Sequence, residues 1–189
     1  MNRDHTKQLL DTMLHPVRMR VMMALAGSQG MTPQQISEQL SDVPQATLYR
    51  HINRLAGAGL LQLVEERPVR GTLEKVYALN RAGHSHLSGE DMASLTKEDH
   101  LRYFTAFAVS LIDQFSRYLS RSESADLAAD GAGYAQVPLF MTDDELAEFS
   151  RAVNQAVLPY LQPDGAQPDG KKRKKRLLAT IMMPEISGE

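Results

Sequence analysis

The chain of 189 residues contains no cysteine and no tryptophan, and only 6% of its residues are aromatic. Without cysteine there is no disulfide, no thiolate ligand for a metal and no thiol-based redox sensor. No apolar run approaches the ~20 residues that a membrane span needs, and residues 1–11 lack the pattern of a signal peptide. We therefore expect a cytoplasmic protein that has no membrane partner.

The net charge of −2 is divided unevenly along the chain. Residues 1–82 hold 10 Lys and Arg against 7 Asp and Glu, residues 83–170 hold 5 against 14, and residues 171–189 hold 6 against 2. Because phosphate repels the acidic middle region, contact with nucleic acid is expected mainly from the N-terminal region. The basic surplus there is small, which favours two copies of the chain on one DNA site.

Residues 33–40 and 44–55 have the pattern of two short helices joined by a tight turn. Thr32 is a favourable N-cap, and Pro33 and Pro44 suit the first turn of a helix. The second helix has an apolar stripe with helical spacing, which consists of Leu48, Ile52 and Leu55. This pattern is typical of a helix-turn-helix motif, whose second helix enters the DNA major groove.

The other face of the second helix carries side chains that can recognise bases. Arg binds guanine through two hydrogen bonds, Gln can bind adenine, and the methyl groups of Ala and Thr can contact thymine. The expected DNA contacts are Thr32, Gln34, Gln45, Ala46, Thr47, Tyr49, Arg50 and Arg54. An amphipathic helix whose polar face is only solvated is the alternative interpretation.

The flanking segments extend the motif to a winged helix. A further helix is predicted at 15–26, and two strands are predicted at 60–65 and 75–79, separated by a turn with Pro and Gly. Basic side chains in such a turn are attracted by the negative potential of DNA. We therefore expect Arg67, Arg70 and Lys75 to contact the duplex.

Three segments resemble ArsR-type winged-helix repressors. They are LHPVRMRV (14–21), ATLYRHINRL (46–55) with AGLL (58–61), and RG (70–71) with EKVYAL (74–79). The resemblance covers residues from about 4 to 80, and MarR and PadR proteins share parts of it. It implies a homodimeric transcription factor on double-stranded DNA, usually a repressor that a ligand releases. The metal-sensing members use cysteines, so their chemistry does not apply to this chain, and no cofactor is expected.

A capping-box pattern at 96–99 predicts the start of a helix that runs to about residue 120. Such a helix would be roughly 36 Å long at 1.5 Å per residue, and no nearby helix is long enough to cover its apolar stripe. We predict a homodimer whose interface contains Leu101, Phe104, Ala108, Leu111, Phe115 and Leu119. The alternative interface is the first helix, around Leu9, Leu10 and Met13.

The remainder of the chain predicts a small α+β unit. A strand is expected at 134–141, a capped helix from 142 to about 161, and a second strand at 177–184. We interpret the basic run at 171–176 as the solvated entry to that strand, with DNA contact as the alternative. A space lined by Phe104, Phe107, Phe115, Phe140 and Phe149 would suit a small hydrophobic or aromatic effector, unless these residues are packed core.

No catalytic constellation is recognisable, so an enzyme is not expected. His84 and His86 are interpreted as surface histidines rather than metal ligands. The predicted fold is mainly α with a small β component (α+β): a winged helix-turn-helix domain at 1–82, a linker and long dimerisation helix at 83–121, and a strand-helix-strand unit at 122–189. The predicted function is a sequence-specific DNA-binding regulator controlled by a ligand. The alternative is a regulator or architectural protein whose C-terminal half only dimerises or binds a protein.

Overall fold

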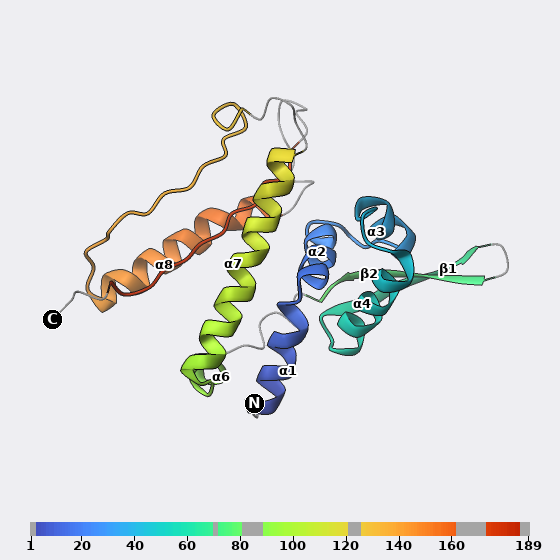
Figure 1. Ribbon diagram of the computed structural model, residues 1–189, viewed down its shortest axis with the longest axis horizontal. Helices are drawn as coiled ribbons and strands as arrows, with labels where there is room; N and C mark the ends of the chain where they lie inside the picture. Colours follow the sequence, from blue (N-terminus) through green and yellow to red (C-terminus); the bar gives the residue numbers. More distant parts are fainter. Residues whose placement is uncertain (1–2, 70–71, 81–88, 121–125, 162–172, 186–189) are drawn as a thin grey trace. The chain divides into compact units, whose positions relative to one another are not determined.

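The computed structural model describes residues 3–69, 72–80, 89–120, 126–161 and 173–185. The chain divides into two compact units, Met1–Ala125 and Asp126–Glu189. The first unit contains α1 (Arg3–Met13), α2 (Pro16–Leu25), α3 (Pro33–Gln39), α4 (Gln45–Gly57), β1 (Leu61–Val69), β2 (Thr72–Leu79), α6 (Gly89–Ala93) and α7 (Lys97–Ser120) (Figure 1). The second contains α8 (Asp143–Val157) and a 3-10 turn at Leu158–Tyr160. This order confirms the predicted α+β winged helix-turn-helix fold.

Capping boxes fix the starts of three helices, as the sequence predicts for α7 and α8. At α3, the Thr32 hydroxyl accepts from the Gln35 amide at 3.2 Å, and the Gln35 side chain accepts from the Thr32 amide at 2.9 Å. The same reciprocal bonds join Thr96 to Asp99 and Thr142 to Glu145. Each pair satisfies amide groups that the first turn of a helix leaves without partners.

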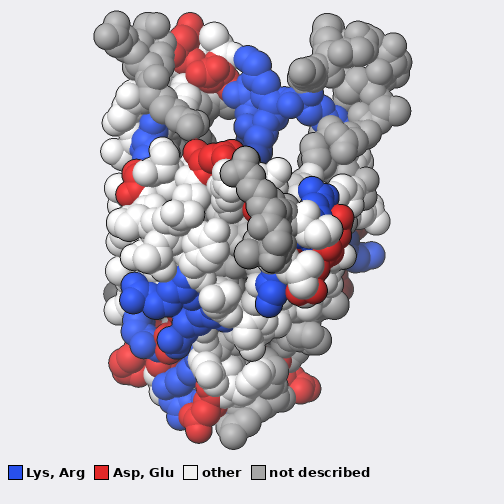
Figure 2. Space-filling view, turned by 90° about the vertical axis from the view of Figure 1, so that its right-hand side faces the viewer, with Lys and Arg blue, Asp and Glu red and all other residues white. Residues whose placement is uncertain are grey.

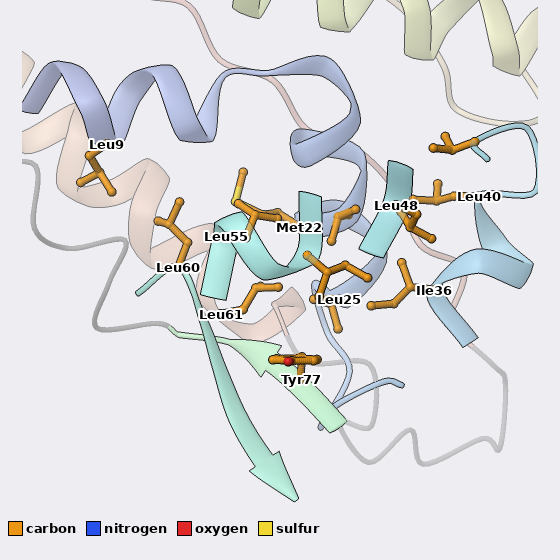
Figure 3. Close-up of a cluster of buried hydrophobic side chains, with 13 residues drawn as sticks. Leu9, Met22, Leu25, Ile36, Leu40, Leu48, Leu55, Leu60, Leu61 and Tyr77 are labelled. Atoms are coloured by element: carbon orange, nitrogen blue, oxygen red, sulfur yellow. The ribbon is translucent and has the colours of Figure 1, made fainter. Parts of the chain in front are cut away.

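The core of the N-terminal unit lies between α2, α3, α4 and the hairpin (Figure 3). Leu48, Ile52 and Leu55 of α4 are at most 1% exposed, as the predicted stripe requires. They pack with buried residues of the neighbouring elements, among them Val21, Leu25, Ile36, Leu60 and Tyr77. Because burial of apolar surface is the main favourable term in folding, this cluster holds α4 in place from behind.

The antiparallel hairpin of β1 and β2 is joined to the helices through the residues that precede α3. Met31 exchanges two backbone hydrogen bonds with Tyr77, at 2.8 and 2.9 Å. Next to it, Gly30 has a φ of +151°, and an added Cβ would lie 2.8 Å from a Val76 methyl and 2.9 Å from a Val64 methyl. Glycine is therefore required where this loop crosses the hairpin.

Helix α7 packs against the winged helix through a face that combines polar side chains with the buried ring of Tyr103, which packs on Leu10. Its buried residues are Asp99, Tyr103 and Ser110, which share one side of the helix. The Asp99 carboxylate lies 2.7 Å from the Lys7 ammonium, which keeps the pKa of Asp99 well below its usual range. The Tyr103 hydroxyl donates to the Lys7 carbonyl at 3.3 Å. Figure 1 shows α7 running beside α1 and α2.

The C-terminal unit confirms the predicted helix but not the two predicted strands. Residues 134–141 and 177–184 run in the direction opposite to α8 (Figure 1) and belong to no strand. A strand requires a hydrogen-bonded neighbour, and no described residue of this unit provides one in a single chain. None of its described residues is buried either. In the described part of the whole chain, no helix has the length and apolar character needed to cross a membrane.

Candidate nucleic-acid interface

Helix α4 turns the predicted base-reading residues away from the core. At 100° per residue, Ala46 and Arg50 lie opposite the buried Leu48 stripe, while Gln45 and Tyr49 lie on one flank and Thr47 and Arg54 on the other. All of these side chains are exposed except Thr47, which is partly exposed. The structure therefore brings the six predicted α4 residues together on one accessible surface.

The two arginines of this surface are available to a ligand. Arg50 and Arg54 form no ion pair with any acidic residue in the described part of the chain. A guanidinium without an internal partner can donate to base edges or phosphates and has no salt bridge to break first. Arg50 is the better candidate for a base contact because it points directly away from the core.

The two predicted contacts at the start of α3 have different surroundings. Thr32 is only 4% exposed, and its hydroxyl is engaged as the N-cap of α3. We therefore assign Thr32 to helix capping and leave it out of the candidate interface. Gln34 is exposed, and its amide donates to Glu38 at 3.4 Å within the same helix. It remains a candidate contact.

The wing carries a mixed charge instead of a basic one. Arg67 and Lys75 are exposed, but Arg67 donates to the Glu65 carboxylate at 2.8 Å. Glu66 and Glu74 also lie on the hairpin, and in Figure 2, which faces the hairpin end of the molecule, acidic and basic side chains are intermixed. A phosphate would have to compete with Glu65 for Arg67. The third predicted wing residue, Arg70, lies outside the described residues.

Two histidine rings in contact join α4 to the start of α2, and the sequence did not predict this contact. The rings of His15 and His51 have centroids 4.5 Å apart and are tilted by 38°. Burial lowers the pKa of both rings, and the nearby Arg18 and Arg54 lower it further. Arg18 is 6% exposed and donates to the Asp11 carbonyl at 2.7 Å. Only the tertiary structure brings these two rings together.

This histidine pair predicts a loss of stability in mild acid. A histidine in the unfolded chain takes up a proton near pH 6.5, whereas His15 and His51 in the folded protein do so only at lower pH. The free energy of unfolding should therefore be flat above about pH 6.5 and fall as the pH drops below it. Denaturant unfolding between pH 5 and 8 measures this.

The matched variants are His51→Gln and His100→Gln. His51→Gln should reduce the pH dependence, because it removes one of the two shifted groups. His100→Gln, at an exposed position on α7, should leave it unchanged. The same slope in His51→Gln and in the unmodified protein would contradict this assignment.

The predicted dimer residues lie on the side of α7 that faces away from the winged helix. Leu101 is 67% exposed, and Phe104, Phe115 and Leu119 are also exposed. Ala108 and Leu111 are partly exposed. Ile112, at 69% exposed, belongs to the same face. The alternative interface is less accessible, because Leu9 and Leu10 are buried within the N-terminal unit.

The predicted ligand residues are divided between the two units. Phe104, Phe107 and Phe115 belong to α7, whereas Phe149 belongs to α8 and Phe140 precedes it. Phe140 is 94% exposed. A hollow of about 410 Å³ in the N-terminal unit is lined by Gln8, Thr12, Arg54, Gly57 and Ala58, and none of the five phenylalanines lines it. The effector site stays a prediction.

The described histidine, aspartate and glutamate side chains form no group of three that could hold a metal ion. His84 and His86 lie outside the described residues.

The basic run at 171–176 is described only in part, because Lys171 and Lys172 also lie outside the described residues. Within that run, Arg173 donates to the Pro159 carbonyl at 3.1 Å.

The comparison with known families agrees with this geometry. The family model of a helix-turn-helix domain matches residues 13–64, which include α2, α3 and α4 and extend into β1. No curated protein matches the chain. The match supports a DNA-binding regulator. Residues 13–64 are therefore similar to a helix-turn-helix domain, a module whose general role is to bind DNA.

Proposed function

We propose that the protein is a homodimeric transcriptional repressor of the ArsR-like type that acts in the cytoplasm and is controlled by a small apolar ligand. The observation that carries the DNA-binding part is the outer face of α4. This face belongs to the helix-turn-helix domain, and its arginines have no internal acidic partner among the described residues. α4 would lie in the major groove, with the wing beside it.

Substitution of Arg50 by alanine tests this proposal directly. Loss of a base-reading arginine should weaken binding to the preferred DNA by about 1–3 kcal/mol and relax the base preference at one position. A duplex selected from a random library with the unmodified protein provides the DNA, and fluorescence anisotropy at fixed salt measures both affinities. A scrambled duplex of the same length is measured in parallel.

The matched control is Arg151→Ala, which removes an exposed arginine from α8. It should leave both affinities unchanged, because the residue lies outside the helix-turn-helix domain. If Arg50→Ala binds both duplexes as tightly as the unmodified protein does, α4 is not the reading helix. If both affinities fall equally, Arg50 contacts phosphate and does not read a base.

Dimerisation is supported by the exposed apolar face of α7. Helix α7 has 24 residues, and in a single chain it exposes the apolar side chains of Leu101, Phe104 and Ile112. This exposed apolar surface is unfavourable in water. An antiparallel or parallel copy of α7 would cover that face over its full length. A symmetric pair would also present two copies of α4 to the two halves of one DNA site.

Ligand control is proposed from the exposed apolar side chains of the C-terminal unit. The C-terminal unit is acidic in the first turn of α8 and has many exposed apolar side chains, including Phe140, Leu178 and Met183. A small apolar effector is one molecule that such side chains could bind. Because none of the described residues of this unit is buried, a protein partner is the second candidate, and in that case the C-terminal half would only dimerise or bind that partner.

A screen of apolar and aromatic metabolites by thermal shift separates the two candidates. An effector should raise the melting temperature and also lower affinity for the selected duplex, because a ligand shifts an equilibrium only through different affinities for its two states. Phe149→Ala should weaken both responses, whereas Asn154→Ala, at an exposed position on the same helix, should not. Absence of any stabilising compound would favour the protein partner.

A further inference from the structure

Asp42 occupies the turn of the helix-turn-helix motif, between the end of α3 and the start of α4. Its carboxylate binds two arginines from different helices. Arg20 of α2 donates to both oxygens, at 2.6 and 2.9 Å. Arg117 of α7 donates to one of these oxygens at 3.0 Å. A single side chain of the DNA-binding motif is therefore bonded to the long helix.

Each arginine partner of Asp42 is restrained by a second feature. The Arg117 guanidinium also donates to Asp113, one turn earlier on α7, at 2.9 Å, so its orientation is set from its own helix. The side chain of Arg20 is only 15% exposed. The hydrogen bonds from Arg20 and then Arg117 keep the pKa of the Asp42 carboxyl well below its usual range. The carboxylate is therefore charged at every physiological pH.

Asp42 connects the far end of α7 with the reading helix. Near its start, α7 is bonded to α1, through Asp99 with Lys7 at 2.7 Å and Arg102 with Asp11 at 3.1 Å. Arg117 lies near the other end of α7. α4 begins soon after Asp42, because Pro44 is its N-cap. A small displacement of this turn would therefore move the N-terminal end of α4, which is the end expected to enter the groove.

We propose that Asp42 is a positioning residue that ties the orientation of the recognition helix to that of α7 through Arg117. The inference rests on the proposed dimer with two half-sites. In that dimer, the angle between the two copies of α7 would set the separation of the two recognition helices. An effector or partner that changed this angle would move both reading helices through the same contact. Arg20 would hold the turn locally, whereas Arg117 would transmit the geometry of the dimer.

Two duplexes distinguish a residue that only supports the turn within its own subunit from one that transmits the geometry of the dimer. One is the duplex selected with the unmodified protein, and the other is the same duplex with one half-site scrambled. Arg117→Gln should weaken binding to the intact duplex about fivefold, the size expected for a half-exposed ion pair. It should weaken binding to the half-scrambled duplex by a smaller factor, because only the intact duplex requires correct spacing of the two recognition helices. Arg20→Gln should weaken both, because it loosens the turn in each subunit.

Two further variants control for structural effects at Arg117. Glu98→Gln removes an exposed carboxylate from the first turn of α7 without touching Arg117 or the helix-turn-helix motif, and should leave both affinities unchanged. Arg117→Lys keeps the charge and should restore part of the lost affinity. If Arg117→Gln binds both duplexes as the unmodified protein does, or loses affinity equally on both, the inference is overturned.

A measurement without DNA separates this inference from the proposed function. Amide hydrogen exchange of Val43 and Leu48, which donate to Leu40 and Pro44 at 2.9 and 3.0 Å, reports on the turn and the first turn of α4. Arg117→Gln should accelerate exchange at both amides, and unchanged rates would refute the connection. If the unmodified protein binds both duplexes equally, the two-half-site dimer is wrong, and the exchange rates alone decide the role of Asp42.

Discussion

A Phe104→Asp protein should sediment as a monomer and bind the selected duplex far more weakly than the unmodified protein. Phe104 is 43% exposed in the single chain, so an aspartate there is solvated in the monomer. In the proposed dimer the same aspartate would be an unpaired buried charge, which is unfavourable by several kcal/mol. Sedimentation velocity over a range of concentrations measures the change in association.

The control for Phe104→Asp is Ser116→Asp. Ser116 is exposed on α7 but lies beside the apolar face and not at its centre. It should leave the dimer intact, and both variants should keep the helical circular dichroism of the unmodified protein. A dimeric Phe104→Asp protein would place the interface elsewhere in the chain, and the exposed apolar residues of the C-terminal unit would then be the next surface to test.

A Leu48→Ala protein should lose about 2–5 kcal/mol of unfolding free energy, the usual cost of such a cavity. Leu48 is fully buried and packs in the core cluster of the N-terminal unit. The corresponding decrease in melting temperature is of order 10 °C. The unfolding free energy of a domain is typically about 5–15 kcal/mol, so this loss is a large part of it. DNA binding by Leu48→Ala should therefore fail at a lower temperature than binding by the unmodified protein.

Asn53→Ala provides the comparison on the same helix. Asn53 is exposed on the outer side of α4, so its truncation should change the unfolding free energy by no more than about 0.5 kcal/mol. Thermal and denaturant unfolding should be followed by circular dichroism for both variants. If Leu48→Ala were as stable as Asn53→Ala, the packing of α4 on the core would not be what holds the recognition helix.

Local features of the sequence were sufficient to predict the winged helix-turn-helix domain. The Thr32 cap and the spacing of Leu48, Ile52 and Leu55 act within one or two helical turns, so they can be recognised without any knowledge of distant contacts. The same holds for α7, whose start at Thr96 and Asp99 is a local capping box. The exposed outer face of α4 followed from the helical period once its buried stripe was known.

The surroundings of the candidate contacts were not predictable in this way. Arg67 has the right charge for a phosphate, but the neighbouring Glu65 binds it. The rings of His15 and His51 meet only after α2 and α4 have packed. In these cases the role of a side chain depends on which partner lies close to it in the folded protein.

The starts of the helices and the buried residues of α4 follow from the sequence alone, because capping and periodicity are short-range effects. The side of α7 that faces the winged helix follows only from contacts between residues that are far apart in the chain. That choice depends on Lys7 and Asp42, which lie far from α7 in the chain and meet Asp99 and Arg117. The segments 134–141 and 177–184 also depend on contacts with other parts of a chain. Their composition favours strands, but a strand also requires the backbone of a neighbour, which the described residues of the single chain do not supply.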